Sequence, residues 1–170
     1  MTNRYKSNYD KSPVVVIDER EVIISGWDSI ISKIKEGQSQ KIVIECYHGV
    51  AVSLIISKLK SYFSEGIIFS TERGFRKETL MNEFLEPFLT EDRIFGRMND
   101  LNLEVYFDAS ELNKMRKEWH QAKGVKIAIG VGASLLCLDP DLFIYADMPR
   151  WEIQKKFRKG ILGNVGSSNV

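Results

Sequence analysis

The feature that most constrains this chain is an apolar run followed at once by a glycine-containing turn and then by an apolar stripe at helical spacing. Residues 42–45 form the run, which is typical of a buried strand. After the turn, apolar residues recur at intervals that place them on one face of a helix: Val52, Ile55, Ile56, Leu59 and Phe63. This segment therefore predicts a β-loop-α unit.

The same alternation continues along the chain. Further strand-like apolar runs lie at residues 66–69, 125–129 and 142–145. Helical patterns comprise residues 80–89, a segment that starts at the capping residue Asp108 and carries Leu112, Met115 and Trp119, and residues 150–159. Strands that read as continuous apolar runs and alternate with helices predict an α/β fold of three layers, in which helices cover both faces of a mainly parallel sheet.

Length and composition favour a single folded domain over residues 13–162. A chain of 170 residues that is 44% apolar can bury one core of ordinary size. Residues 1–12 are polar and lack an apolar period, so we interpret them as a flexible leader. Residues 163–170 are rich in Gly, Asn and Ser, so we interpret them as a linker or an end segment.

Two further elements are expected ahead of the first β-loop-α unit. Residues 14–17 and 22–24 are β-branched runs separated by charged residues, a pattern typical of a small hairpin or of two edge strands. Apolar residues then recur at helical spacing from Trp27 to Ile34, ahead of Gly37, which predicts a short amphipathic helix.

Charge and hydropathy narrow the class of protein. The 24 Lys and Arg residues nearly balance the 23 Asp and Glu residues, and the net charge of +1 gives no field that favours nucleic acid or an anionic membrane as a partner. Residues 128–138, among the longest uncharged apolar runs, fall short of the ~20 residues that span a bilayer. We therefore expect a soluble, cytoplasmic protein in which Cys46 and Cys137 are reduced thiols rather than a disulfide.

The loop Glu45-Cys-Tyr-His-Gly-Val-Ala51 stands where a Walker A loop places backbone N–H groups around a phosphate. The Lys and the hydroxyl residue of that motif bind the phosphates and Mg²⁺, but Gly49, Val50 and Ala51 occupy those positions here. The N-terminus of the following helix still carries partial positive charge. Weak anion binding at His48–Ala51 is one interpretation, and a plain strand-to-helix turn is the other.

The histidines give no pattern of a metal site. His48 could act as a general base, an anion donor or a metal ligand, or it could be only a polar loop residue. His120 lies on a separate predicted helix, and the chain contains no CxxC spacing. The sequence therefore predicts neither a metal nor another cofactor in this domain.

A glycine pair follows the strand at residues 125–129. Gly130 and Gly132 stand at the carboxyl end of that strand, where ligands of open α/β sheets collect. Glycines in such a place also permit a tight turn or a close crossing of strands. We include both glycines among the candidate ligand-binding residues, with the turn as the alternative.

The last predicted helix supplies two more candidates, Asp147 just before it and Arg150 at its start. A polar stripe at spacing i, i+4, i+8 comprises Arg150, Gln154 and Arg158. The stripe could meet a carboxylate or phosphate of a ligand, a partner domain, or only solvent. We expect Trp151 or Phe157 to be buried against the sheet.

Two charged segments contain a glycine beside aromatic residues, as loops over active sites often do. They are residues 72–76 and residues 90–97. We select Asp92 and Arg97 from the second segment as candidate site residues, although ordinary exposed loops have the same composition.

Two resemblances meet at these residues. Asp141-Leu-Phe-Ile-Tyr-Ala-Asp147 with the helix that follows looks like the last core strand and the Arg-bearing helix of uridine-kinase-like P-loop proteins. A closer similarity, over about residues 18–164, is to the N-terminal extension of long-form class I mannose-6-phosphate isomerases. It is carried by Glu45-Cys-Tyr-His-Gly-Val50, Thr90-Glu-Asp-Arg-Ile-Phe-Gly-Arg-Met98, Gly130-Val-Gly-Ala133 and Tyr145-Ala-Asp-Met-Pro-Arg-Trp-Glu-Ile-Gln154.

The second resemblance implies a kinase-like fold without a working Walker A loop, placed ahead of a metal-dependent cupin isomerase domain. The zinc ligands and catalytic residues of that family belong to the cupin part, and no segment of this chain matches them. The implied role is docking, assembly or regulation by a phosphorylated ligand, with the cupin domain as partner. The alternatives are a small-molecule or sugar kinase with an atypical phosphate loop, which would bind a Mg²⁺-nucleotide, and a pure protein-interaction domain.

Overall fold

A computed structural model describes residues 13–14, 16, 23–91, 96–98 and 100–167. Its helices are α1 (Trp27–Glu36), α2 (Val52–Tyr62), α3 (Glu78–Leu85), α4 (Ala109–Gln121) and α5 (Arg150–Arg158), and its strands are β1 (Lys41–Cys46), β2 (Ile67–Ser70), β3 (Lys126–Gly130) and β4 (Leu142–Ala146). Short 3₁₀ turns are η1 (Thr71–Gly74), η2 (Glu86–Phe88), η3 (Leu103–Tyr106) and η4 (Ala133–Leu135). Within the described ranges, every helix is too short or too polar to cross a lipid bilayer.

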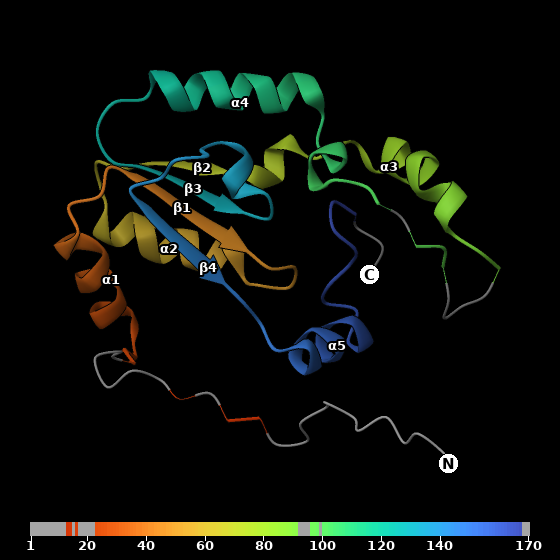
Figure 1. Cartoon of the computed structure of the whole chain (residues 1–170), viewed down its shortest axis with the longest axis horizontal. Helices are drawn as coiled ribbons and strands as arrows, with labels where there is room; N and C mark the ends of the chain where they lie inside the picture. Colours follow the sequence, from red (N-terminus) through yellow and green to blue (C-terminus); the bar gives the residue numbers. More distant parts are fainter. Residues whose placement is uncertain (1–12, 15, 17–22, 92–95, 99, 168–170) are drawn as a thin grey trace, which may run out of the picture.

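The strands form one parallel sheet in the order β2-β3-β1-β4. β1 lies inside the sheet, where Val43 is opposite Ala128 of β3 on one side and Phe143 of β4 on the other. β2 pairs with the far side of β3. Figure 1 shows the strands running in one direction, so that their carboxyl ends share an edge. The predicted α/β class with a parallel sheet is confirmed.

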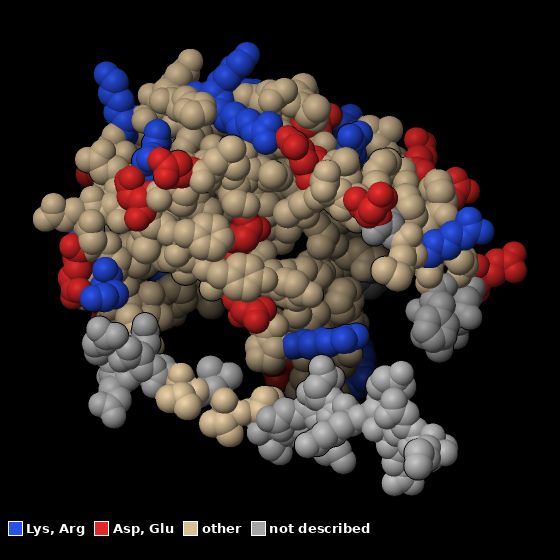
Figure 2. Space-filling view, viewed as in Figure 1, with Lys and Arg blue, Asp and Glu red and all other residues tan. Residues whose placement is uncertain are grey.

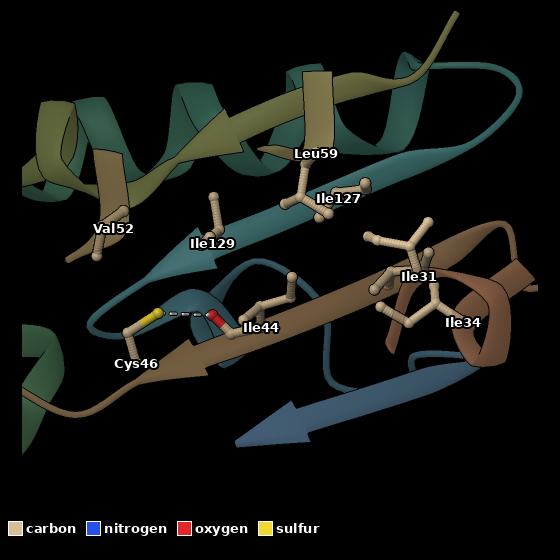
Figure 3. Packing of buried hydrophobic residues seen from close by; sticks show 9 residues of the cluster. Ile31, Ile34, Ile44, Cys46, Val52, Leu59, Ile127 and Ile129 are labelled. Atoms are coloured by element: carbon tan, nitrogen blue, oxygen red, sulfur yellow. Dashed lines mark hydrogen bonds between the residues drawn. The ribbon is translucent and has the colours of Figure 1, made fainter. Parts of the chain in front are cut away.

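Helices α1 and α2 cover one face of the sheet. Alternate residues of β1 and β3 point toward that face, and they pack with buried residues of the two helices (Figure 3): Ile31, Ile34, Ile42, Ile44, Val52, Leu59, Ile127 and Ile129. Cys46 adds a buried thiol at the end of β1. The apolar stripes predicted for these helices are the surfaces that they bury, since burial of such stripes drives helix docking.

Helix α4 covers the opposite face, and its start is fixed by Asp108. The carboxylate of Asp108 accepts hydrogen bonds from the backbone N–H groups of Ser110 and Glu111 at 2.9 and 3.0 Å. The hydrogen bond from the Ser110 hydroxyl, together with these two backbone bonds, holds the pKa of Asp108 below its usual range. The buried stripe of α4 consists of Leu112, Met115 and Trp119. The predicted cap and stripe are confirmed, and Trp119 meets Phe69 of β2 edge-on.

The elements predicted ahead of α1 fall mostly outside the described residues. The proposed leader at residues 1–12 lies entirely outside them. Of the two predicted strands, the described residues are Val14, Val16, Ile23 and Ile24, which are exposed and belong to no strand.

Strand β4 differs from the predicted buried strand because it lies at the edge of the sheet. Phe143 is 52% exposed and Tyr145 is 56% exposed. The cluster under α4 includes residues of β1, β2 and β3 but leaves these two rings uncovered. An apolar run alone cannot show whether a strand lies inside a sheet or at its margin, which is why this prediction is wrong.

Helix α5 also departs from expectation. Trp151 is 56% exposed and Phe157 is 40% exposed, so the expected burial of one of them against the sheet is wrong. Ile153 is the residue that α5 buries. Figure 1 shows the reason, because α5 lies beyond the carboxyl end of β4 rather than on a face of the sheet.

Candidate functional site

A crevice of about 500 Å³ lies at the carboxyl edge of the sheet. The chain leaves β1 for β2 through α2 on one face, and it leaves β3 for β4 through η4 on the other face. Neighbouring strands whose connections depart in opposite directions leave a gap at their carboxyl ends, where ligands of open α/β sheets bind. The crevice has this position, since residues 47–50 after β1, Glu72 after β2 and Val131 after β3 line it.

The loop between β1 and α2, residues 47–51, forms one wall. Gly49 in this loop has a φ of +97°, which favours glycine. A side chain at Gly49 would also stand 3.1 Å from Ile153 of α5 and 3.2 Å from Leu162. Glycine at this position therefore lets the loop turn while α5 packs directly on it.

Helix α5 and the residues after it hold this loop from outside. The Lys156 ammonium donates to the Gly49 carbonyl at 2.7 Å. His48 Nε2 lies 2.9 Å from the Gly163 carbonyl, and because a carbonyl only accepts, the ring donates from Nε2. The His48 ring also contacts Phe157, with centroids 5.8 Å apart. His48 therefore joins the loop to the C-terminal residues in addition to lining the crevice.

The N-terminus of α2 borders the crevice through Val50 and Val52. The N-cap residue, Ala51, offers no side chain to cap the helix, and the first turn contains no acidic residue. The partial positive charge of the helix end is therefore not compensated by side chains of its own first turn. The anion position predicted at His48–Ala51 thus adjoins the crevice, although Ala51 itself is not part of the lining.

Another wall of the crevice contains one cationic and two acidic side chains. Arg76, Glu72 and Glu78 line it. Arg76 Nε donates to the Val105 carbonyl at 2.6 Å, which fixes the direction of the side chain. Glu72 is exposed, so its carboxylate is open to water and to a solute. The crevice thus offers both hydrogen-bond donors and hydrogen-bond acceptors.

Residues 162–167 form a further wall of the crevice. The Ser167 hydroxyl donates to the Glu78 carboxylate at 2.6 Å. A side chain at Gly166 would be in ordinary van der Waals contact with Phe75 and Met81, at 3.4–3.5 Å, so this residue lies against the domain. The part of the expected linker up to residue 167 therefore packs on the folded domain. Composition could not show this, because small residues serve both flexible chains and close backbone packing.

The glycines at the end of β3 have a conformational role. Gly130 has a φ of +127°, and a side chain there would overlap the Thr71 hydroxyl. Gly132 has a φ of +77°, and a side chain there would stand 2.8 Å from the Phe107 ring. Both positions fit the alternative in which glycine permits a tight turn, and neither residue lines the crevice.

The loop after β3 already holds an anion that belongs to the protein. The backbone N–H groups of Gly132 and Ser134 donate to the two carboxylate oxygens of Glu45, at 2.5 and 2.8 Å. Glu45 is a residue of β1, so this carboxylate ties the central strand to the start of η4. The amides of this loop are therefore not available to an external phosphate.

The other predicted site residues lie elsewhere. Asp92 is outside the described residues. Arg97, Asp147 and Arg150 are exposed and do not line the crevice, and the Asp147 carboxylate accepts from the Met148 N–H at 2.7 Å. Order along the sequence could not exclude them, because the position of a loop in space depends on strand order.

Sequence reasoning singled out the segment at residues 72–76 but selected no residue from it. A signal was present, since Glu72 and Arg76 follow the strand predicted at residues 66–69, and ligands collect at carboxyl ends of such strands. The charged loop at residues 90–97 has a similar composition but follows a helix. Position directly after a strand is therefore a better criterion for a candidate site residue than the composition of the loop.

The thiol beside the crevice is not a nucleophile. Burial raises the pKa of Cys46 to about 11, so the group stays protonated near neutral pH. Cys46 and Cys137 are both free, as predicted. Within the part of the chain that the structure describes, no group of three or more His, Cys, Asp or Glu side chains is arranged to hold a metal ion.

Comparison with known proteins identifies a family. Residues 26–170 match the family described as a domain of unknown function, DUF8485, and because the match covers most of the chain, the chain belongs to this family. Neither a curated protein nor a solved structure matches the chain. The link to mannose-6-phosphate isomerase stays a prediction.

Proposed function

We propose that this chain is a ligand-binding domain whose crevice takes a small phosphorylated metabolite with several hydroxyl groups, and that it acts by binding rather than by catalysis. The observation that carries the proposal is the position of the crevice at the carboxyl ends of β1, β2 and β3, with the uncapped N-terminus of α2 at its edge. Helix N-termini in such a place attract anions through the helix dipole. The N–H groups of Val50 and Val52 themselves already donate to the carbonyls of Tyr47 and Val50, so the dipole is the source of the attraction.

The donors around the crevice support a phosphate group. Arg76 is fixed by its bond to the Val105 carbonyl, and guanidinium groups bind phosphate in a bidentate manner. His48 lies on the same crevice. Together with the end of α2, the Arg76 guanidinium offers positive charge without the lysine of a Walker A loop.

The acceptors support a hydroxyl-rich body for the ligand. Carboxylates such as Glu72 accept hydrogen bonds from sugar hydroxyls but repel further phosphate groups. The crevice therefore suits a single phosphate on a polyol or sugar better than the chain of phosphates in a nucleotide. A volume of about 500 Å³ is within the ordinary range for such small-molecule sites.

The kinase alternative has less support. Phosphoryl transfer from ATP needs a metal ion and positive charge on the β- and γ-phosphates, and Gly49-Val50-Ala51 supplies neither. Asp147, an acidic candidate from the sequence, is not part of the crevice lining. A regulatory or docking role beside an isomerase domain is compatible with a binding crevice, but it rests on the sequence resemblance alone.

Thermal unfolding with inorganic phosphate, mannose 6-phosphate, unphosphorylated mannose and ATP tests the proposal. We expect the sugar phosphate to stabilise the protein most, by about 2.7 kcal/mol at a concentration 100 times the Kd. Glu72→Gln should weaken the shift with mannose 6-phosphate more than the shift with inorganic phosphate. Glu65→Gln makes the same chemical change at an exposed position away from the crevice and should have no effect.

Two outcomes would contradict the proposal. One is the lack of any shift with all phosphorylated compounds. The other is a shift that Glu72→Gln and Arg76→Gln leave unchanged, since the ligand would then bind elsewhere. A Mg²⁺-dependent shift with ATP, together with ATP turnover above background, would instead favour the kinase.

A further inference from the structure

The outward face of α5 combines positive charge with an exposed indole. Trp151 is 56% exposed. The Lys155 ammonium lies 5.6 Å and the Arg158 guanidinium 5.4 Å from the centroid of the Trp151 ring. Ile153 points the other way, onto the loop after β1. Helix α5 thus packs on the domain through Ile153 and leaves Trp151 exposed to solvent. Large apolar groups that are exposed to solvent often mark an interaction surface.

The charges on this face are largely unmatched. Arg150, Arg158 and Lys159 are exposed, and none of them forms an ion pair with another described residue. Ile161, just after the end of α5, is also 65% exposed, whereas Phe157, at 40%, lies on the side of the helix toward His48. A basic surface with aromatic groups fits an acidic surface that also carries apolar side chains.

A mainly acidic surface is present on the same chain, on α3, the η2 turn and the residues just after it. Glu83 of α3, Glu86 of η2 and Glu91 are exposed there, again with no ion pair to a described residue. One exposed cation, Arg97, adjoins them, since its backbone N–H donates to the Phe88 carbonyl at 2.8 Å. Leu80 is 47% exposed and Leu89 is 65% exposed beside them. Figure 2 shows mostly acidic side chains, with basic ones among them, at the α3 end of the molecule, and basic side chains at α5.

The two surfaces do not meet within one molecule. Figure 1 shows α3 and α5 in different parts of the fold, with the C-terminal residues between them. Residues 162–167 contact the loop after β1 on one side and Glu78 on the other, which keeps the two helices apart. Each surface therefore has its complement only on another molecule.

We propose that the chain associates head to tail, with the α5 face of one copy docked on the α3–η2 face of a second copy. Trp151 is the apolar anchor of the contact, and Leu80 and Leu89 form its counterpart. Arg150 and Arg158 meet the carboxylates around them. Because the contact uses two different surfaces, each bound pair still exposes one surface of each kind, and association continues into a ring or a filament. The proposal is independent of the crevice ligand.

The same α5 face is a poorer match for a membrane or a nucleic acid. Trp151 and Phe157 are six residues apart, which is not a multiple of the helical repeat, so they do not form one apolar face that could enter a bilayer. The basic surface of α5 is confined to one short helix, and the net charge of +1 adds no wider positive field that would attract a nucleic acid. This small net charge also gives little repulsion between copies.

Sedimentation velocity and light scattering on paired variants test the proposal. Trp151→Ala with Arg158→Ala removes the basic surface, and Glu83→Gln with Glu86→Gln removes the acidic surface. The wild-type chain should form larger species as concentration rises, and each double variant should lower the association constant at least about tenfold. Lys114→Ala with Lys117→Ala, at exposed positions of α4, is the matched control and should associate like the wild type.

Mixing the two double variants gives the sharpest test. Each retains one intact surface, and these two surfaces complement each other, so the mixture should form one-to-one dimers and nothing larger. Raising the ionic strength from about 0.1 M to about 1 M shortens the screening length from about 10 Å to about 3 Å and should weaken the dimer.

Several outcomes would overturn the proposal. They are a wild-type chain that stays monomeric at every concentration, association that neither double variant affects, and a mixture that stays monomeric. Binding to anionic vesicles or to a single-stranded oligonucleotide that depends on Trp151 and Arg158, without self-association, would assign the surface to that partner and overturn the proposal as well.

Discussion

The loops after β1 and β3 follow neighbouring parallel strands and both contain glycine, yet the protein uses them in opposite ways. The loop after β3 points its amides at Glu45, so a carboxylate of the protein fills its anion position. The loop after β1 is held from outside through the Gly49 carbonyl, and the α2 end stays uncapped beside the crevice. A glycine-rich loop at the carboxyl edge therefore indicates an anion site only after internal carboxylates have been accounted for.

The largest effect should come from Gly130→Ala. The new side chain would overlap the Thr71 hydroxyl at a φ of +127°, so we expect a loss of about 3 kcal/mol or more in the free energy of unfolding. Gly124→Ala is the control, because Gly124 has a φ of +77° with open space around it and should cost about 1 kcal/mol. Chemical denaturation of both variants measures the difference. Equal losses would show that the close approach of the loop to Thr71 is unimportant.

Removal of the internal anion should have the next largest effect. Glu45→Ala leaves the N–H groups of Gly132 and Ser134 without their acceptor, which should lower the free energy of unfolding by about 2–3 kcal/mol. Glu45→Gln keeps one acceptor oxygen and should lose about half as much. If added phosphate restores the stability of Glu45→Ala, the two loops are equivalent anion sites. If it does not, the loop after β3 is purely structural.

Cys46, at the end of β1 and beside both loops, should make stability fall at alkaline pH. Burial raises its pKa from 9.0 in the unfolded chain to about 11 in the folded protein. The folded state therefore keeps the thiol proton over a pH range in which the unfolded state has lost it. The stability is fully present below pH 9 and decreases by about 2 kcal/mol as pH rises toward 11.

Urea unfolding at a series of pH values, with Cys46→Ala for comparison, measures this contribution. Tyr62 and Tyr145 also have raised pKa values, through the Asp28 hydrogen bond and through burial, and they act in the same direction. Only the part of the pH dependence that the variant removes belongs to Cys46. A variant with an unchanged pH profile would contradict the assignment.

The smallest of these effects concerns the support of the loop after β1. Lys156→Met removes the bond to the Gly49 carbonyl and should cost about 1 kcal/mol of unfolding free energy. Lys155→Met removes only a surface pair with Glu152 and should change stability by less than about 0.5 kcal/mol. Thermal unfolding of both variants measures the difference, and equal, negligible effects would show that α5 does not support the loop.

Local sequence signals were enough to find most elements of the fold. The apolar stripe from Val52 and the strand before it gave the first β-loop-α unit, and Asp108 gave the start of α4. These signals work because helix periodicity and N-capping depend on residues a few positions apart. The site was found in part, since His48, Gly49 and Val50 line the crevice but its charged wall was not selected.

The sequence by itself determined that this chain builds parallel strands with helices on both faces, because continuous apolar runs and amphipathic stripes can bury their surfaces only in such layers. Only the tertiary structure decided which loop keeps an internal anion, which strand lies at the edge, and which side of α5 faces solvent. Glu45 and Ser134 are far apart in sequence, as are Gly49 and Lys156. Contacts of this kind depend on strand order, which is a property of the whole chain and leaves no periodic trace in any one segment.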